Sequence, residues 1–486
     1  MTPKRAANSG GAGTRPVIVR TLSGAETRLP VAAFDALAKS FGQRLVLPDD
    51  HEYDNARRVW NGLIDRRPAA IAACRDAADV QRCLHFARTQ DLLIAVRGGA
   101  HNVAGFATCD GGIVIDLSGM RRISVDPAAR TARVGPGVTW GELDRETQAF
   151  GLAVPGGVVS TTGVAGLTLG GGQGWLRRTY GMSCDSLLSA DVITADGECL
   201  TASDTANTEL FWALRGGGGN FGIVTEFVFR LHPVGPLVTF VAPVFPIEAA
   251  KAALAGFREF VRTAPDAVNA SAVLWTVPAG SGFPRPFHGR AVVTVAGIFV
   301  GEPERGEQVL QPLRKVAEPL FDLSSRLQYT ELQRQFDPLF PKGDLYYWKA
   351  SQLDDLSDDV VSEIEEATHS RPSPLSMIGV WGLGGAMSRV GPEETAVGRR
   401  DARFLVEALG NWKEQEHTGR NVAWVRDMFA APRQLSSGRP NFNFPGLAED
   451  TDAFVRGVFG SQYHRLRAVK RKYDPSNLFR LNQNLT

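Results

Sequence analysis

Cysteine is scarce in this sequence, and an excess of charge of one sign is missing. Only 5 of its 486 residues are cysteine, and no two are spaced Cys-x-x-Cys. A dense disulfide scaffold and a zinc knuckle are therefore not expected. Lysine and arginine total 53 against 52 aspartates and glutamates, a net charge of +1. Because no basic run is present, neither nucleic acid nor an anionic membrane is an expected partner.

Long apolar runs are missing too. No run of about 18 apolar residues occurs, so no membrane-spanning helix is predicted. The first twenty residues are small and polar, and they lack both the apolar centre of a secretory signal and a twin-arginine pattern. We therefore expect a cytoplasmic protein whose residues 1–20 form a flexible tail.

The remaining chain divides into two patterns. From about 66 to 236, short β-rich runs alternate with glycine loops and a few helices, which predicts a mixed α/β or α+β layer. From 237 to about 440, longer helices alternate with strands. The last stretch holds one long amphipathic helix that ends at Asp474-Pro475. With 43% apolar residues, the chain can bury a large core.

Glycine occurs 52 times and is concentrated in four loops between predicted strands. Consecutive small residues leave backbone N–H groups free to turn inward, an arrangement suited to a phosphate. Each loop alone can be an ordinary tight turn. Together they favour backbone that wraps closely around one large, planar, phosphate-bearing ligand. The loops are residues 97–102, 155–166, 169–175 and 215–222.

One glycine motif imitates a dinucleotide site. Residues 217–222, Gly-Gly-Gly-Asn-Phe-Gly, match the pattern G-x-G-x-x-G. A Rossmann site needs a strand before this motif and a helix after it. Here the helical segment TELFWALR comes first and the strand IVTEFVF follows, so a Rossmann site is rejected. A P-loop is also absent from the sequence, since no Gly-Lys-Ser/Thr occurs.

His101 stands in the first glycine loop. Two interpretations stay open from the residues alone. A histidine in such a loop is commonly an ordinary hydrogen-bonding residue. Alternatively, its imidazole faces a cofactor and serves as the nucleophile for a covalent attachment.

Several ordered motifs resemble one known family. They are RGGAHNVAGFATCDGGIVIDLSGM, ARVGPGVTWGEL, VPGG, GVAGLTLGGGQGWLRRTYGMSCDSLLSADVITADGE, LFWALRGGGGNFGIVTEF and, near the C-terminus, YHRLRAVKRKYDPSNLFRLNQN. These strings are similar to the berberine-bridge-enzyme-like flavoproteins of the vanillyl-alcohol-oxidase (PCMH-type) superfamily. The match is close over 66–236 and at the C-terminus and loose over 237–440, and the N-terminal half is most similar to bacterial hydroxynicotine oxidases.

The resemblance implies an α+β fold. Residues 21–236 would form a PCMH-type FAD-binding domain with its core at about 66–236. Residues 237–440 would form an inserted substrate-binding domain, an antiparallel sheet with helices on one face. Residues 441–486 would return to the FAD domain.

The resemblance also implies FAD as cofactor, bound covalently through His101, and no metal. Matched by position, the FAD-binding residues are Arg97, Gly98, Gly99, Ala100, His101, Asn102, Pro155, Gly156, Gly157, Gly163, Gly166, Gly170, Gly171, Gly172, Gly174, Asn220, Gly222, Ile223, Val224, Asn482 and Asn484.

Three positions depart from the family pattern. Many relatives carry a second covalent link through a cysteine at the position that Val159 occupies here, so a single link is expected. Asn441 stands where relatives have the tyrosine of a Tyr-x-Asn motif, while Asn443 keeps the other member. Arg399 replaces a histidine of the family. The FAD site is therefore expected to be intact, whereas the usual catalytic base is not.

The missing tyrosine favours substrates that lose hydride with little help, such as a neutral amine or an electron-rich phenol. Substitute bases are sought in Tyr347 and Lys349, with Tyr329 and Tyr463 as further candidates. Each of these side chains could equally be part of the core. Gln173 and Asn441 are expected to face the flavin or the substrate.

The resulting expectation is an FAD-linked oxidase. A small organic molecule would give hydride from a C–H next to nitrogen or oxygen to flavin N5, and O₂ would take up the electrons to give H₂O₂. The small Thr162, about where relatives tune oxygen access, is compatible with this reaction. Two alternatives stay open: a redox-neutral or oxygenating enzyme of a biosynthetic pathway, and a catalytically silent FAD-binding protein.

Overall fold

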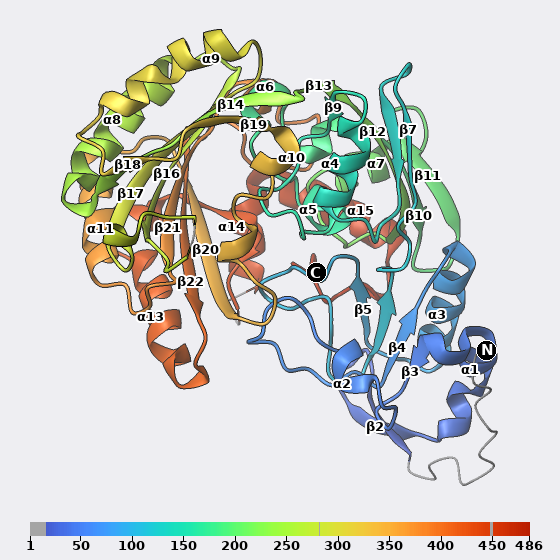
Figure 1. Ribbon diagram of the computed structural model, residues 1–486. Coiled ribbons are helices and arrows are strands. Elements are labelled where there is room, and N and C mark those ends of the chain that lie inside the picture. The colour runs from blue at the N-terminus through green and yellow to red at the C-terminus, as the bar shows by residue number, and fades with distance from the viewer. Residues whose placement is uncertain (1–15, 281, 448–450) are drawn as a thin grey trace, which may run out of the picture.

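The structure is a computed structural model that describes residues 16–280, 282–447 and 451–486 (Figure 1). Three larger sheets organise these residues. Two of them, with four and five strands, are built from the N-terminal half of the chain, and one ten-stranded sheet is built from the C-terminal half. No helix within the described ranges is long and apolar enough to cross a membrane.

The four-stranded sheet is mostly parallel. Its order is β3 (Leu45–Val46), β4 (Ala70–Ala73), β6 (Ile113–Asp116) and β5 (Ile94–Arg97). The strands β4, β6 and β5 run parallel, and α3 (Ala77–Thr89) makes the crossover from β4 to β5. The side chain of Asp76 caps α3 by accepting from the backbone N–H of Asp79. This sheet carries the loop of residues 97–102 directly after β5.

The five-stranded sheet is antiparallel throughout. Its order is β11 (Cys199–Ser203), β10 (Leu187–Ile193), β12 (Ile223–Arg230), β8 (Thr131–Val134) and β7 (Ile123–Asp126). Helix α7 (Thr208–Leu214) precedes β12, so the loop of residues 215–222 lies between a helix and a strand, as the sequence predicts.

The ten-stranded sheet is antiparallel and covered by helices on one face. Its main path runs β18 (Phe321–Asp322), β15 (Pro243–Pro246), β17 (Ala291–Phe299), β16 (Val268–Thr276), β21 (Met377–Gly382), β22 (Phe404–Trp412), β20 (Leu345–Leu353) and β23 (Arg439–Pro445). Off this path, β14 (Leu237–Val241) pairs with β17 and with β19 (Ser325–Gln328).

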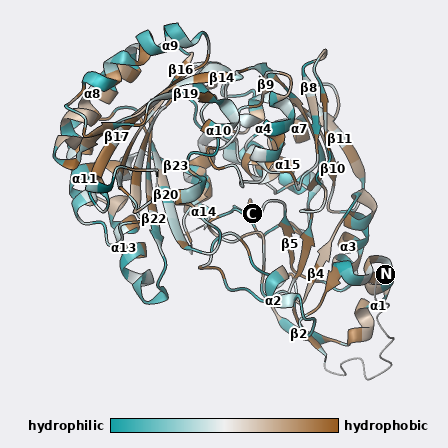
Figure 2. Ribbon diagram, in the orientation of Figure 1, coloured by the Kyte–Doolittle hydropathy of each residue, from teal (hydrophilic) through white to brown (hydrophobic). Residues whose placement is uncertain are grey.

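Helices α8 (Ala250–Thr263), α11 (Asp358–His369) and α13 (Thr418–Met428) pack on the outer face of this sheet (Figure 1). The strands are largely apolar, while much of α11 and α13 is polar (Figure 2). The buried cluster beneath the helices includes Phe257, Ile364 and Trp412. The predicted α+β class, with an antiparallel sheet and helices on one face, is confirmed.

The C-terminal segment lies against the N-terminal half. Helices α14 (Thr451–Phe459) and α15 (Tyr463–Tyr473) share a buried cluster with α7. The ammonium of Lys470 donates to the backbone carbonyls of Asn220 and Phe479 and pairs with Asp474 at 2.7 Å. These contacts tie the end of the chain to the loop that opens β12. Strand β23 extends across the predicted boundary at residue 440, because it pairs with β20 of the large sheet.

Candidate active site

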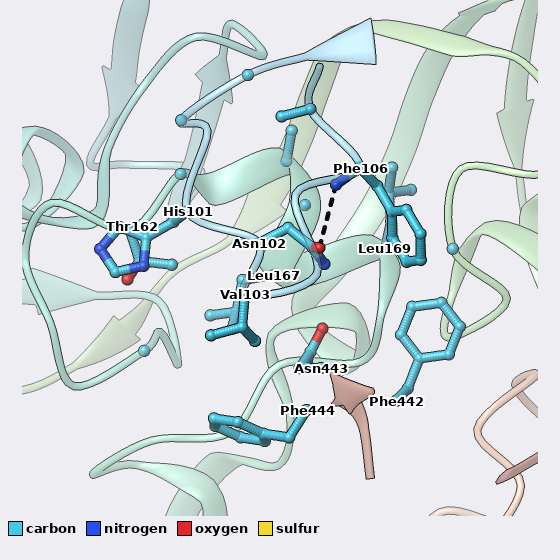
Figure 3. A pocket seen from close by; sticks show the side chains of 18 of the residues that line it. His101, Asn102, Val103, Phe106, Thr162, Leu167, Leu169, Phe442, Asn443 and Phe444 are labelled. Carbon is cyan, nitrogen blue, oxygen red and sulfur yellow. Dashed lines mark hydrogen bonds between the residues drawn. The ribbon is translucent and has the colours of Figure 1, made fainter. Parts of the chain in front are cut away.

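A cavity of about 330 Å³ lies between the glycine loops and the inner face of the ten-stranded sheet. In Figure 3, His101 and Thr162 lie together at one end of it, and Phe106, Leu169 and Phe442 gather at the other. The two halves of the chain therefore contribute opposite walls to one site.

The glycine loops meet backbone to backbone at Gly99 and Gly163. A Cβ added at Gly99 would lie 2.5 Å from the Cα of Gly163, so no side chain fits between the two loops. Gly166 and Gly219 differ from this pair because a Cβ at either would meet nothing within 4 Å. Both line the cavity, and their missing side chains leave a bare backbone surface there.

Thirteen of the predicted FAD-binding residues line the cavity. They are Gly98, Gly99, Ala100, His101, Asn102, Gly157, Gly163, Gly166, Gly174, Gly222, Ile223, Val224 and Asn482. Val159 and Thr162 line it as well, as do two of the predicted catalytic residues, Gln173 and Asn441.

The other predicted FAD-binding residues do not line this cavity. They are Arg97, Pro155, Gly156, Gly170, Gly171, Gly172, Asn220 and Asn484.

Arg97, for example, donates to the carbonyl of Ala56 behind its loop. A Cβ on Gly156 would lie 2.4 Å from the indole of Trp140, so this glycine packs a loop onto α4 (Trp140–Gln148). The Asn220 carboxamide donates to the carbonyl of Gln483.

His101 is held between an aromatic ring and a hydroxyl. Its imidazole stacks on Trp60 with the ring centroids 4.1 Å apart, and its Nε2 lies 3.2 Å from Oγ1 of Thr161. Burial lowers the pKa of His101 to about 3. The imidazole is therefore neutral near pH 7, with a lone pair on one ring nitrogen.

The opposite wall is formed by the inner faces of β16, β20, β21, β22 and β23 and by two residues from a connection between strands. The residues of this wall are mostly large and apolar, with one acidic exception. They are Val273, Phe336, Phe340, Trp348, Met377, Trp381, Leu405, Leu409, Phe444 and the acid Glu407.

Glu407 is the one carboxylic acid among the described residues that line the cavity. It is 7% exposed, and its Oε2 accepts a hydrogen bond of 2.7 Å from Nε1 of Trp381. Burial raises the pKa of Glu407 to about 7, against the opposing effects of the Trp381 hydrogen bond and the charge of Arg177. The acid therefore exchanges its proton near neutral pH. Glu407 is not among the residues predicted from the sequence; its signal there is a single acid in the apolar strand Phe404–Trp412.

The placement of Tyr347 and Lys349 corrects the prediction that they face the substrate. Side chains alternate along β20, and Trp348 takes the cavity face. Tyr347 points to the helix side, where it is 1% exposed and its hydroxyl accepts from Nε of Arg426 at 3.1 Å. Lys349 lies on the same strand face as Tyr347 and does not line the cavity.

The further candidates Tyr329 and Tyr463 do not line the cavity either. Tyr329 is fully buried in a cluster with Leu176 and Leu332, and burial holds its pKa well above the usual value. Tyr463 is buried in the cluster of α14 and α15. Neither placement supports a role as base.

Arg177 joins the two walls. Its guanidinium donates to the carbonyls of Gly174 on the loop side and of Ala270 and Gly382 on the sheet side, at 2.7 to 2.9 Å. It also lies over the ring of Trp381, 4.9 Å from the ring centroid. All three bonds end on backbone, so Arg177 fixes the spacing of the walls, and burial lowers its pKa to about 9.

Two family models match the chain: "FAD binding domain" over residues 68–203 and "Berberine and berberine like" over residues 441–486. The (R)-6-hydroxynicotine oxidase of Paenarthrobacter nicotinovorans is 32% identical over 91% of this chain and 96% of that protein. An FAD-linked oxidoreductase of Bacillus subtilis, YgaK, is 30% identical over 91% of this chain and 96% of that protein. The chain belongs to the berberine-bridge-like FAD-linked oxidoreductases.

A solved structure supports the same assignment. The crystal structure of 6-hydroxy-D-nicotine oxidase from Arthrobacter nicotinovorans superposes with a TM-score of 0.81 at 30% identity, covering 91% of this chain and 97% of that one. The resemblance seen in the sequence is thereby confirmed, and the protein is an FAD-linked oxidoreductase.

The cavity of this flavoprotein fits FAD. The bare backbone at Gly166 and Gly219 offers a surface on which a planar ring can lie. Gln173 lines the cavity, and both polar atoms of its buried carboxamide lack a hydrogen-bond partner within the described part of the chain. The same holds for Oδ1 of Asn482. Buried polar groups normally have partners, so these atoms point to a polar ligand such as the flavin edge.

Proposed function

We propose that the protein is an FAD-dependent oxidase of small organic molecules. The observation that carries this proposal is a single buried acid, Glu407, on an aromatic wall that faces the cofactor loops across one cavity. FAD, when bound, supplies the hydride acceptor and passes the electrons to O₂, which gives H₂O₂. The protein's part is to bind and orient the substrate, exclude water and move one proton.

Glu407 is the proposed proton acceptor. Removing a proton from the N–H or O–H of the substrate eases loss of hydride from the neighbouring carbon. A general base works best when its pKa lies near the working pH, and burial brings the pKa of Glu407 to about 7. Trp381 Nε1 holds one carboxyl oxygen at 2.7 Å and so orients the other. Glu407 would thus replace the tyrosine that is missing at Asn441.

The surroundings of Glu407 favour an amine with an apolar or aromatic body. Trp348, Phe340 and Phe444 offer ring faces and edges to such a body. The nearby guanidinium of Arg177 donates to backbone carbonyls and forms no ion pair with Glu407 among the described residues, so the carboxylate can attract a protonated amine. A sugar would leave many hydroxyl groups against apolar side chains, which costs free energy.

We also propose that His101 attaches FAD covalently. Nε2 is occupied by Thr161, and the ring is neutral and held flat against Trp60. An oriented, uncharged imidazole is a competent nucleophile. Because Val159 stands at the second attachment position, one link is expected.

The test begins with the visible spectrum of the purified protein before and after acid precipitation. Yellow colour that stays with the pellet, and that His101→Ala moves to the supernatant, supports the covalent link. Colour that leaves the wild-type pellet overturns the link but not FAD binding. A protein that is colourless even after FAD is added overturns the proposed function.

Substrates are then tested by anaerobic bleaching of the flavin, with arylalkylamines first and alcohols and sugars after them. Bleaching that air reverses with release of one H₂O₂ per turnover supports the oxidase. Conversion of a substrate without O₂ uptake would instead support redox-neutral chemistry.

A further inference from the structure

One short segment of the substrate-side half, residues 329–340, crosses to the cofactor side of the cavity. It contains α10 (Tyr329–Leu332) and the 3₁₀ turn η7 (Asp337–Leu339). Figure 1 shows α10 beside α4 of the N-terminal half, and the two helices are in contact. Below, these twelve residues are called the 329–340 segment.

Gln333 bonds to the second glycine loop, in the part formed by residues 157–160, called the 157–160 loop below. Its Nε2 donates to the carbonyl of Gly157 and to Oδ2 of Asp144, both at 3.1 Å. Gln333 is 1% exposed, so water cannot replace these bonds if the side chain is removed.

Asp337 bonds to Ser160, which lies three residues after Gly157 in the same loop. Its carboxylate accepts from the backbone N–H of Ser160 at 2.8 Å and from Oγ of Ser160 at 2.5 Å. A charge-assisted pair of bonds to one residue fixes both the position and the direction of the backbone.

Residues 157–160 are held on their other side by α4. The N–H of Gly141 donates to the carbonyl of Ser160 at 2.8 Å, and the N–H of Trp140 donates to the carbonyl of Thr162 at 3.0 Å. Gly157 and Val159 line the cavity between these two supports. The position of this part of the cofactor wall is therefore set jointly by α4 and by the 329–340 segment.

The 329–340 segment also forms part of the substrate wall. Phe336 and Phe340 line the cavity, and Phe336 stacks on Trp175 with the ring centroids 6.1 Å apart. The carbonyl of Phe340 accepts from Nε1 of Trp60, whose indole stacks on His101. A single segment thus contacts the substrate space, the 157–160 loop and the residue that packs against the flavin attachment point.

We propose that Gln333 and Asp337 are positioning residues that hold the 157–160 loop against bound FAD, so that the 329–340 segment aligns the cofactor wall with the substrate wall. The inference rests on the proposed function, because it requires FAD in this cavity. It predicts that weakening either contact loosens FAD, although neither side chain lines the cavity.

The experiment measures reversible FAD binding in a His101→Ala background, where no covalent link can hide a loss of affinity. Gln333→Leu and Asp337→Asn are compared with Gln335→Leu, a matched control in the same segment whose side chain is exposed. Quenching of FAD fluorescence gives Kd. We expect Kd to rise about tenfold for each of the first two variants and to stay unchanged for the control.

A double-mutant cycle separates positioning from general stability. Ser160→Ala and Asp337→Asn disrupt the same contact, so their effects on FAD Kd should be far from additive. Loss of stability alone would lower Tm without changing Kd at temperatures well below Tm. If Gln333→Leu does not fold, the Ser160–Asp337 cycle decides the question.

The inference is overturned if folded Gln333→Leu and Asp337→Asn proteins bind FAD as tightly as the Gln335→Leu control. That result leaves the proposed function intact, because the background protein still binds FAD. If the background protein itself fails to bind FAD, and the wild type is colourless with added FAD, the proposed function fails instead.

Discussion

Glu407 and Trp381 are joined by a hydrogen bond of 2.7 Å across neighbouring strands of the cavity wall. Burial favours the neutral acid, whereas the indole N–H favours the carboxylate. Together with the charge of Arg177, which also favours the carboxylate, these effects give a pKa of about 7. In the proposed mechanism, the pair would serve as a proton acceptor at neutral pH without a histidine or a tyrosine.

Replacing Glu407 with glutamine should remove the proton acceptor and preserve the shape of the wall. We expect kcat/KM to fall about 10²- to 10⁴-fold, the usual contribution of general acid–base catalysis. The acidic limb of the pH profile, near pH 7 in the wild type, should vanish as well. Glu318→Gln on the exposed surface is the matched control. A variant that keeps both the wild-type rate and the pH limb would exclude Glu407 as the base.

Trp381→Phe should keep the ring but remove the N–H donor to Glu407. Without that bond the carboxylate is less stable, so the pKa of Glu407 rises further. The acidic limb of kcat/KM should therefore move to higher pH, with the maximal rate at high pH reduced less than in Glu407→Gln. A pH profile of the same substrate in both proteins measures the shift, and a limb that moves to lower pH would contradict the assignment.

Trp60 offers a test of how His101 is oriented. Trp60→Ala removes the ring that stacks on the imidazole, whereas Trp60→Phe keeps an aromatic face and loses only the bond to the Phe340 carbonyl. We expect the covalent fraction of FAD, measured on acid-precipitated protein, to fall severalfold in Trp60→Ala and little in Trp60→Phe. Equal covalent fractions in all three proteins would show that stacking does not orient the nucleophile.

The glycine loops could be located from the sequence because they combine short-range signals. Three of the four loops follow or precede a strand, whereas residues 169–175 lie between α5 (Val164–Leu169) and α6 (Arg177–Tyr180) rather than between strands as predicted. Where the backbone at Gly99 contacts the backbone at Gly163, no residue other than glycine fits. The loop residues that do not line the cavity, such as Gly156, could not be distinguished from those that do. Gly156 is required by the indole of Trp140, a contact between segments that no local pattern reveals.

The substrate wall could not be derived in the same way. Strand β20 is buried on both faces, so its sequence lacks the alternation that tells inside from outside. A shift of one residue exchanges the two faces of the strand. The sequence therefore does not reveal that Trp348, rather than Tyr347, faces the cavity. An acid such as Glu407 in a doubly buried strand is informative, because burying a charge costs free energy unless it has a function or a partner.

Asp144 should make the protein less stable as the pH rises. Burial raises its pKa from 3.8 to about 7, with the Gln333 hydrogen bond opposing the change. Between these pH values the unfolded chain has lost this proton and the folded chain retains it, so the free energy of unfolding falls as pH increases. The loss is complete above pH 7 and amounts to at most about 4 kcal/mol. Asp144→Asn removes it.

The measurement is Tm at pH 5 and at pH 8. The difference in Tm between the two pH values should be a few degrees smaller in Asp144→Asn than in the wild type. Glu407 titrates in the same window, so Glu407→Gln should show a similar reduction and the double variant a larger one. An unchanged difference in Asp144→Asn would mean that Asp144 is ionised in the folded protein at pH 5.

Gly166 and Gly163 distinguish a glycine needed for FAD from a glycine needed for the fold. Gly166 lies in α5 (Val164–Leu169), lines the cavity and has no protein atom within 4 Å of an added Cβ. Gly166→Leu should therefore fold, and its apoprotein should be as stable as the wild-type apoprotein or more so, since leucine favours a helix over glycine. Its side chain would project into the cavity, so FAD should no longer bind.

Gly163→Ala, in contrast, should make the apoprotein less stable. Its added Cβ would lie 2.6 Å from the backbone nitrogen of Gly99, and backbone atoms cannot move aside cheaply. We expect a lower Tm even without FAD. Circular dichroism, Tm of the apoproteins and absorbance at flavin wavelengths separate the two cases. A yellow Gly166→Leu protein with wild-type affinity would show that the flavin does not lie on this part of the wall, because the leucine side chain and the isoalloxazine ring cannot share that space.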